Sequence, residues 1–162
     1  MTDLVIRRAE PRDFPAIRAI YRAAWTSAYG GIVPQGAIDR VTALSDEAIS
    51  AVLAEEQPGL FVAEAEGAVA GWIRLAGRLV KSLHVDPARQ GIGVGQQLLT
   101  YGAGLIGGGA YLVCLSENHR ARAFYRSRGW REDGDTVEKI DGVNYPAIRY
   151  VAPPAPAAEP RR

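Results

Sequence analysis

Several kinds of reactive residue are scarce in this chain of 162 residues, which has one cysteine, one methionine and two histidines. The single Cys114 cannot form an internal disulfide, which is typical of proteins from a reducing compartment. Because Cys114 lies in an apolar segment, we expect a buried and inert thiol. His84, His119 and one cysteine without ligand spacing argue against a metal site.

Excess charge and long apolar runs are missing as well. Nineteen Lys and Arg residues face eighteen Asp and Glu residues, so the chain lacks the basic field that nucleic-acid binding requires. Five arginines between 120 and 131 form a local patch, interpreted first as a solvated helix face and second as a phosphate contact. No apolar run reaches the roughly 18 residues of a membrane helix, and the first residues lack a signal-peptide pattern. The expected location is the cytoplasm, with no nucleic-acid or membrane partner.

Glycines, by contrast, are concentrated in one short segment, residues 91–95, whose pattern indicates a function. An apolar segment from Leu79 to Val85 is broken by Asp86-Pro87, and a helix is expected to open near Gly93. Between them lies the segment Gln90-Gly91-Ile92-Gly93-Val94-Gly95-Gln96. A helix start with few side chains offers unpaired N–H groups and partial positive charge, which suits a phosphate or pyrophosphate. Arg89 adds a full charge, and the alternative is a tight turn without a ligand.

The spacing of these glycines narrows the choice of ligand. Gln96 stands where the dinucleotide-binding fingerprint needs a glycine, and no Gly-Lys-Ser/Thr sequence follows as in a P-loop. A nucleotide-binding protein is therefore the weaker interpretation. The pattern Gln90-x-x-Gly93-x-Gly95 after an apolar strand closely resembles the acyl-CoA pyrophosphate loop of the GNAT superfamily of N-acetyltransferases.

A second motif strengthens this resemblance. Residues 118–130 read Asn118-x-x-Ala121-x-x-Phe124-Tyr125-x-x-x-Gly129-Trp130, which is similar to the other hallmark of that superfamily. An asparagine cap, an amphipathic helix and a terminating glycine follow a predicted strand. An ordinary core helix gives no reason for Asn118 and Tyr125 at these offsets. The resemblance extends from about Leu4 to Val151.

Hydrophobic periodicity predicts an α+β fold with the element order βααβββαβαββ, which matches the mixed, mostly antiparallel sheet of the GNAT superfamily. Residues 1–151 are expected to form one acyltransferase domain, and the Pro- and Ala-rich residues 152–162 a disordered tail. Two-residue turns are predicted at Glu66-Gly67 and Asp141-Gly142. Gly102 and Gly104 should each weaken their helix by about 1 kcal/mol relative to alanine.

The resemblance implies acetyl-CoA as acyl donor and a set of residues that bind it. The backbone of Leu83, His84 and Val85 would pair with pantetheine as an added strand does. The other residues implied in donor binding are Arg89, Gln90, Gly91, Ile92, Gly93, Val94, Gly95, Gln96, Asn118 and Tyr125. Tyr125 is also the implied catalytic residue, because a phenol can give a proton to the departing thiolate.

For the acceptor side, the resemblance suggests Trp25, Tyr29, Trp72 and Lys81. Strict alternation along residues 79–85 places Lys81 with Leu83 and Val85 on the face toward the amine, and His84 behind the sheet. Relatives carry a carboxylate or imidazole on that face, so no general base is assigned. A cation at Lys81 would favour an acceptor bearing a carboxylate, unless this side chain only extends into solvent.

The sequence thus predicts an acetyl-CoA-dependent N-acetyltransferase that acts on a primary amine of a small molecule or peptide by direct attack. The alternative from another class is a non-catalytic acyl-CoA-binding regulatory module. Neither the identity of the amine nor the acyl group beyond acetyl is determined, and a homodimer is left open.

Overall fold

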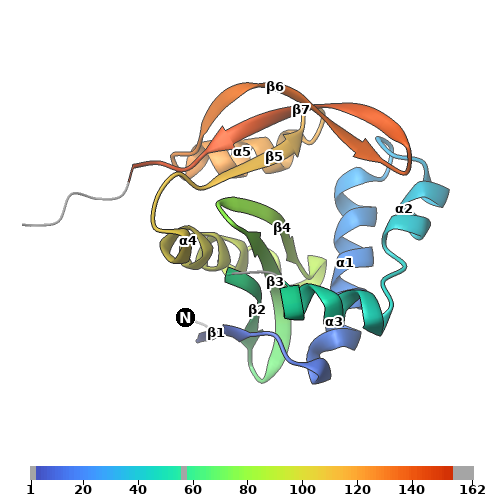
Figure 1. Ribbon diagram of the computed structural model, residues 1–162, viewed down its shortest axis with the longest axis vertical. Coiled ribbons are helices and arrows are strands. Elements are labelled where there is room, and N and C mark those ends of the chain that lie inside the picture. The colour runs from blue at the N-terminus through green and yellow to red at the C-terminus, as the bar shows by residue number, and fades with distance from the viewer. Residues whose placement is uncertain (1–2, 56–57, 155–162) are drawn as a thin grey trace, which may run out of the picture.

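The computed structural model describes residues 3–55 and 58–154 of the chain, so most of the tail predicted at 152–162 lies outside the described residues. Figure 1 shows a curved sheet with helices on both faces and a hairpin that extends over one end. The strands are β1 Leu4–Arg8, β2 Pro58–Ala65, β3 Ala68–Ala76, β4 Leu79–Val85, β5 Tyr111–Leu115, β6 Arg131–Ile140 and β7 Val143–Val151. The helices are α1 Phe14–Tyr29, α2 Gln35–Val41, α3 Asp46–Glu55, α4 Val94–Ile106 and α5 His119–Ser127.

The α+β class and the strand sequence match the prediction, but the helix α2 was not anticipated. This helix has seven residues, begins after Pro34 and includes Gly36. Seven residues with only two buried side chains, Ala37 and Ile38, are too few to show a helical repeat of apolar residues in the sequence. Packing of Ile38 beneath the hairpin therefore stabilises a helix that local propensity does not specify.

The seven strands lie in the order β1-β2-β3-β4-β5-β7-β6, and every neighbouring pair is antiparallel except β4 with β5. The parallel pair makes a single ladder contact, Leu79 with Tyr111, after which the two strands diverge. Both predicted turns are confirmed, since Glu66-Gly67 and Asp141-Gly142 have the positive φ angles that two-residue hairpins require. The divergence leaves an open edge on β4 in the middle of the molecule.

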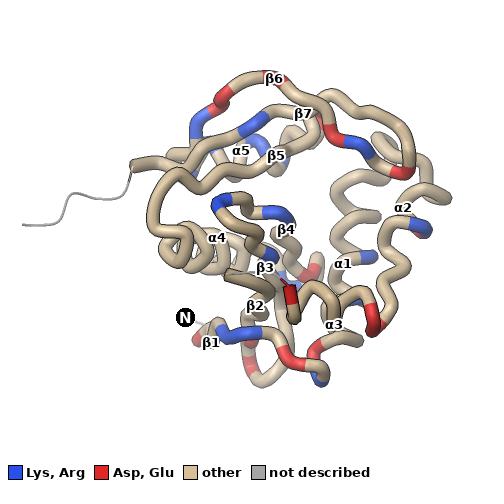
Figure 2. The backbone as a smooth tube through the Cα atoms, in the orientation of Figure 1, with Lys and Arg blue, Asp and Glu red and all other residues tan. Residues whose placement is uncertain are grey.

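Three apolar clusters hold these layers together. On one face of the sheet, Leu98 and Leu99 of α4 pack against Ile73 and Leu75 of β3. On the opposite face, α1 packs against β2 and β3 through a cluster that contains Phe14, Ile17, Ile20, Leu60, Val62 and Trp72. The third cluster joins the α1–α2 region to the end of β5 and the β6–β7 hairpin. Figure 2 shows basic and acidic residues interspersed along the backbone, in keeping with the balanced composition.

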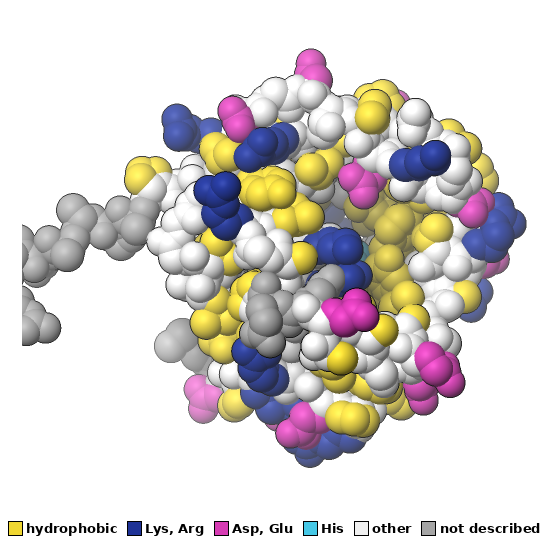
Figure 3. All heavy atoms as spheres, viewed as in Figure 1, with side chains coloured by type: hydrophobic (Ala, Val, Ile, Leu, Met, Phe, Trp, Pro, Cys, Tyr) yellow, Lys and Arg dark blue, Asp and Glu magenta, His cyan; other side chains and the backbone are white. Residues whose placement is uncertain are grey.

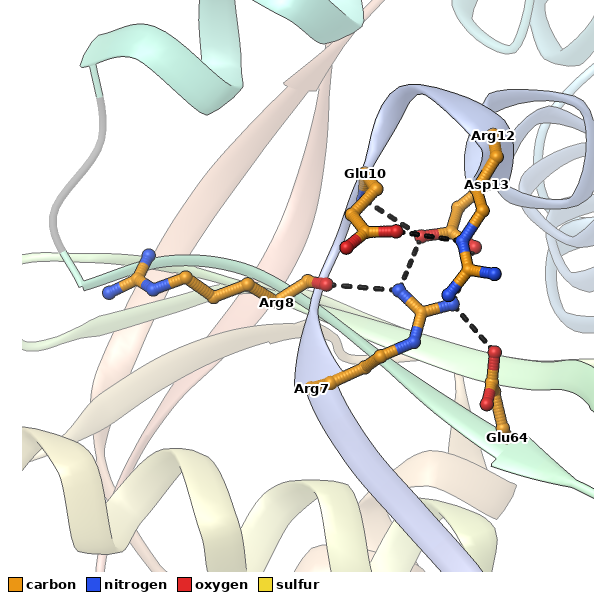
Figure 4. A network of polar contacts seen from close by, with 6 residues as sticks. All are labelled: Arg7, Arg8, Glu10, Arg12, Asp13 and Glu64. Carbon is orange, nitrogen blue, oxygen red and sulfur yellow. Dashed lines mark hydrogen bonds and ion pairs between the residues drawn. The ribbon is translucent and has the colours of Figure 1, made fainter.

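The connection from β1 to α1 is fixed by a buried ion pair. Arg7 donates two hydrogen bonds of 2.8 Å to the carboxylate of Asp13 and one of 2.6 Å to Glu64 (Figure 4). Asp13 is only 4% exposed, and its carboxylate also accepts the backbone N–H of Glu10. The hydrogen bonds from Arg7 hold the pKa of Asp13 below its ordinary value of 3.8. This network orients the start of α1, the helix whose far end reaches the site described below.

Gly102 and Gly104, in the C-terminal half of α4, are expected to respond oppositely to alanine, although both interrupt the helix in the same way in the sequence. A Cβ on Gly102 would lie 2.8 Å from Cδ1 of Ile73 and 3.1 Å from Cδ2 of Leu75, whereas a Cβ on Gly104 would meet nothing within 4 Å. Gly104→Ala should raise the free energy of unfolding by about 1 kcal/mol through helix propensity. Gly102→Ala should lower the free energy of unfolding by about 1 kcal/mol, because the steric conflict of the new methyl group with Ile73 and Leu75 costs more than helix propensity contributes. Urea denaturation of both variants measures this, and stabilisation by both would contradict the close packing of α4.

Candidate functional site

A cavity of about 590 Å³ opens where β4 and β5 diverge. Its walls come from the end of α1, the ends of β4 and β5, the loop before α4, and α5. The lining residues are Ala24, Ser27, Ala28, Tyr29, Leu83, His84, Val85, Gln90, Gly91, Gly93, Val94, Gly95, Gln96, Val113, Cys114, Asn118, Arg120, Ala121, Phe124, Tyr125 and Arg128. All residues predicted to bind the donor are among them except Arg89 and Ile92.

The loop before α4 offers backbone donors to the cavity. Gly93 is the N-cap of α4 with φ of 88°, a left-handed conformation that glycine adopts without cost, and no side chain caps the helix. A Cβ on Gly95 would lie 3.4 Å from Val85 and 3.5 Å from Phe124, so a larger residue here would close the space between β4 and α5. The start of α4 therefore presents uncapped amides and the positive end of a thirteen-residue helix to the cavity.

Two arginines from α5 and its C-terminal end supply the full positive charge at this end, in place of Arg89. The guanidinium of Arg120 donates to Gln90 Oε1 at 2.6 Å, and that of Arg128 donates to Gln96 Oε1 at 3.2 Å. Arg89 instead donates to the carbonyl of Ala65 at 3.0 Å. Arg89, which the sequence predicted to bind the donor, therefore does not line the cavity, because the turn at Pro87–Arg89 directs its side chain to the β2–β3 hairpin.

Ile92 is a second residue that the structure places outside the cavity. Its side chain is 44% exposed and is absent from the cavity wall, because Gly91 and Gly93 on either side have positive φ angles that turn the loop outward between them. The local arginine patch at 120–131 serves more than one role. Arg122 fits a structural role, since it bonds the Ser116 carbonyl and Glu132, whereas Arg120 and Arg128 are cavity residues.

The edge of β4 facing the cavity carries backbone groups that β5 does not pair. Leu83, His84 and Val85 pair with β3 on one side, while β5 forms its ladder pair with β4 only at Leu79. Such an edge can accept an extended ligand as an additional strand. The opposing wall from β5 includes Val113, an apolar residue.

Tyr125 of α5 lines the cavity and is surrounded by rings of Phe124 at 5.4 Å, Tyr150 at 5.8 Å and Trp130 at 6.2 Å between centroids. Burial raises the pKa of Tyr125 well above its ordinary value of 10.0, and nearby Cys114 raises it further. The phenol therefore stays protonated at physiological pH, and its hydroxyl can donate a hydrogen bond.

Tyr29, Cys114 and Asn118 complete this end of the cavity. Asn118 is the N-cap of α5, because its Oδ1 accepts the N–H of Ala121 at 3.2 Å, as the sequence predicted. Burial raises the pKa of Tyr29 to about 12, opposed by a side-chain hydrogen bond with Asn118. The expectation of a buried Cys114 is confirmed, since it is 5% exposed and burial raises its pKa to about 11.

His84 lies on the face opposite Leu83, as alternation predicts, but that face is not remote from the cavity. Its ring contacts Tyr21 of α1 at 5.0 Å and Trp72 of β3 at 4.9 Å between centroids, and the residue lines the cavity. Burial among these rings lowers the pKa of His84 to about 3, so the imidazole is neutral at physiological pH.

Of the residues predicted for the acceptor, the structure places only Tyr29 in the cavity wall. Trp25 packs behind it, 4.7 Å from the Tyr29 ring. Trp72 is 3% exposed and belongs to the core beneath α1, because β3 is a central strand with both faces covered. Neither tryptophan could be separated from a core residue by sequence, since core and cavity walls use the same side chains.

Lys81, which the sequence predicted to face the amine, does not line the cavity. The register of β3 with β4 shifts, since Arg74 lies opposite Ser82 but Leu75 lies opposite Val80. Lys81 is the additional residue of this bulge, and the alternation on which its face was assigned does not hold across it. Its side chain is exposed and does not contribute to the cavity wall.

Comparison with known proteins finds similarity to N-acetyltransferases. Residues 56–132 match the family model of the acetyltransferase (GNAT) domain. The protein named "Probable N-acetyltransferase Rv2775", from Mycobacterium tuberculosis, is 25% identical to this chain over 167 residues. The match covers 92% of this chain and 93% of that protein. In residues 3–55 and 58–154, no helix has the length and apolar character needed to span a membrane, and no three metal-binding side chains gather.

Solved structures share the fold. Apo YjaB of Escherichia coli has a TM-score of 0.75 at 22% identity, covering 94% of this chain and 99% of its own. The paia N-acetyltransferase of Thermoplasma acidophilum, solved with coenzyme A, has a TM-score of 0.72 at 19% identity, covering 91% and 98%. The protein yncA of Salmonella typhimurium, solved with its cofactor acetyl-CoA, has a TM-score of 0.62 at 22% identity, covering 98% of each chain.

Proposed function

We propose that this chain, whose residues 56–132 match the acetyltransferase (GNAT) domain, transfers an acetyl group from acetyl-CoA to a primary amine of a small molecule or peptide. The observation that carries the proposal is the divergence of β4 and β5, which opens one cavity from the uncapped start of α4 to the tyrosines of α1 and α5. An anion site and a protonated phenol thus border the same space.

The residues present fit the parts of acetyl-CoA. The pyrophosphate would lie on the amides from Gly91 to Gln96, where Arg120 and Arg128 supply the countercharge. Pantetheine would continue along the unpaired edge of Leu83 to Val85. Shape supports this arrangement too, because Gly95 leaves the narrow space between Val85 and Phe124 open.

Acetyl-CoA supplies an activated carbonyl and a thiolate leaving group. The hydroxyl of Tyr125, kept protonated by its surroundings, would donate to the sulfur as the carbon–sulfur bond breaks. A backbone N–H near Val85 would hydrogen-bond the carbonyl oxygen while negative charge develops on it. Tyr29 and its neighbours on α1 would border the amine.

A non-catalytic acyl-CoA-binding module is the second candidate. It is favoured by the cavity wall, which contains no carboxylate among the described residues, and by the low basicity of His84. The two candidates differ in turnover and not in binding of the donor.

A panel of primary amines, assayed for release of free coenzyme A from acetyl-CoA, is expected to reveal at least one acceptor with turnover well above hydrolysis. Mass spectrometry should find the acetyl group on the amine nitrogen. Tight binding of acetyl-CoA without turnover on any alkylamine, arylamine, amino acid, polyamine or peptide would favour the binding module. Failure to bind acetyl-CoA would contradict both candidates.

A further inference from the structure

The helix α5 brings Tyr125, and its N-cap Asn118, into the cavity wall, although the core holds this helix only weakly. It has nine residues, which is too short for a helix to be stable by itself, and none of them is fully buried. Ala121, Phe124 and Tyr125 contact the core cluster with half-buried side chains only. The direction in which α5 presents Tyr125 therefore depends on further contacts of this helix.

Arg122 of α5 makes such contacts. Its guanidinium donates to the Ser116 carbonyl at 2.9 Å, to Oε1 of Glu132 at 3.0 Å and to the hydroxyl of Tyr150 at 3.2 Å. The Tyr150 hydroxyl in turn donates to the same Glu132 oxygen at 3.1 Å. A guanidinium suits this arrangement because its planar group holds its donors in fixed directions. One side chain thus joins α5 to the turn after β5 and to both strands of the β6–β7 hairpin.

The burial of this network distinguishes it from the other charges of the hairpin. Figure 3 shows basic and acidic side chains next to one another on the surface over β6 and β7. An exposed pair such as Arg149 with Asp133, 3.7 Å apart, contributes little to stability. Glu132 is also 43% exposed, but the Arg122 side chain is only 19% exposed and Tyr150 is fully buried. The network therefore fixes the position of Arg122 against a buried group.

The same buried group is a packing partner of the proposed proton donor. The ring centroids of Tyr150 and Tyr125 lie 5.8 Å apart. At the start of α5, the Ser116 carbonyl that Arg122 binds lies two residues before the N-cap Asn118. Arg122 itself does not line the cavity. It therefore constrains α5 at its start and beside Tyr125 without contacting the space proposed for the donor.

We propose that Arg122 is a positioning residue, which holds Tyr125 in the orientation for proton donation through its contacts with Ser116 and Tyr150. This inference rests on the proposed acetyl transfer and adds a residue that acts on the same site from outside it. A displacement of about 1 Å in a reacting group can cost about 100-fold in rate. Loss of the guanidinium should therefore affect turnover more than binding of acetyl-CoA.

The test compares Arg122→Met with Arg126→Met. Arg126 belongs to the same helix and is 55% exposed, and its guanidinium approaches Glu132 only to 4.0 Å. Arg122→Met should lower the turnover number about tenfold or more, with the Michaelis constant for acetyl-CoA within about threefold of the native value. Arg126→Met should leave both within about twofold. An equal loss in the two variants, or no loss in Arg122→Met, would overturn the proposal.

A double-mutant cycle with Tyr125→Phe examines whether Arg122 acts through that hydroxyl. Arg122→Met should lower turnover by less than about twofold in the Tyr125→Phe background, because the group that it positions is already absent. Losses that multiply in the double variant would mean that Arg122 acts independently of Tyr125, against the proposal. If Arg122→Met does not fold, Tyr150→Phe takes its place with the same expectations, since it keeps the buried ring and loses only the hydroxyl.

Fluorine NMR of the protein labelled with 3-fluorotyrosine gives a readout that needs no turnover. The signal of Tyr125, one of seven tyrosines, is identified by its loss in Tyr125→Phe. It should shift in Arg122→Met and stay in place in Arg126→Met. An unmoved signal in Arg122→Met would contradict the proposal. A shifted signal without turnover on any amine would count against acetyl transfer and still support the positioning of Tyr125 by Arg122.

Discussion

Replacing Tyr125 by phenylalanine is expected to lower the turnover number about 100-fold while the affinity for acetyl-CoA changes little. The ring remains packed against Phe124, Trp130 and Tyr150, so the variant loses only a hydroxyl that stays protonated in its apolar surroundings. Steady-state rates of coenzyme A release, with the best acceptor from the amine panel, measure the effect.

Tyr101 provides the matched control. It belongs to α4 and packs on Phe61 at 5.3 Å between centroids, away from the cavity wall. Tyr101→Phe should leave turnover within about twofold of the native value. An unchanged rate in Tyr125→Phe would mean that Tyr125 is only a core aromatic, and proton donation to the thiolate would have to come from elsewhere.

Acetyl-CoA at about 100 times its dissociation constant should stabilise the native protein by about 2.7 kcal/mol. For a domain of this size, that corresponds to a rise in melting temperature of roughly 5–10 °C. NAD and ATP at the same concentration should give smaller shifts, because they cannot also occupy the β4 edge with a pantetheine arm. Differential scanning fluorimetry measures all three, and equal shifts would contradict the coenzyme A assignment.

Gly93→Asp should abolish the acetyl-CoA shift without unfolding the protein. Aspartate tolerates the left-handed conformation better than most residues and is a favoured N-cap, so α4 should keep its stability. Its carboxylate, however, would occupy the position of the phosphate and repel it. Gly142→Asp is the control, since it has a similar φ of 81° in the β6–β7 turn and should retain the full shift. A normal shift in Gly93→Asp would mean that the loop does not bind phosphate.

The sequence determined features that depend on near neighbours. The cap of Asn118 on Ala121, the left-handed Gly93 before α4, and the Glu66-Gly67 turn each require residue types at fixed short offsets. The backbone groups that these residues satisfy or expose lie within a few positions of them. For that reason, the amino-acid sequence alone is enough to locate the glycine-rich loop before α4 and the α5 motif.

The positions of the other side chains at the cavity depend on contacts between segments that are far apart in the sequence. The displacement of Lys81 from the cleft follows from a bulge against β3, and the direction of Arg89 follows from a carbonyl on β2. Arg120 and Arg128 join the loop before α4 only because α5 packs beside it, and Ile140 packs with Ile38 of α2 only because the hairpin crosses over it. Sequence patterns determine which side chains share a face of one helix or strand. They do not determine what packs against that face, because the partner can lie about a hundred residues away, as in the hydrogen bond from Arg40 to Asp141. The end of the cavity at the loop before α4 was therefore predictable from local motifs, and the end assembled from α1, β4 and β5 was not.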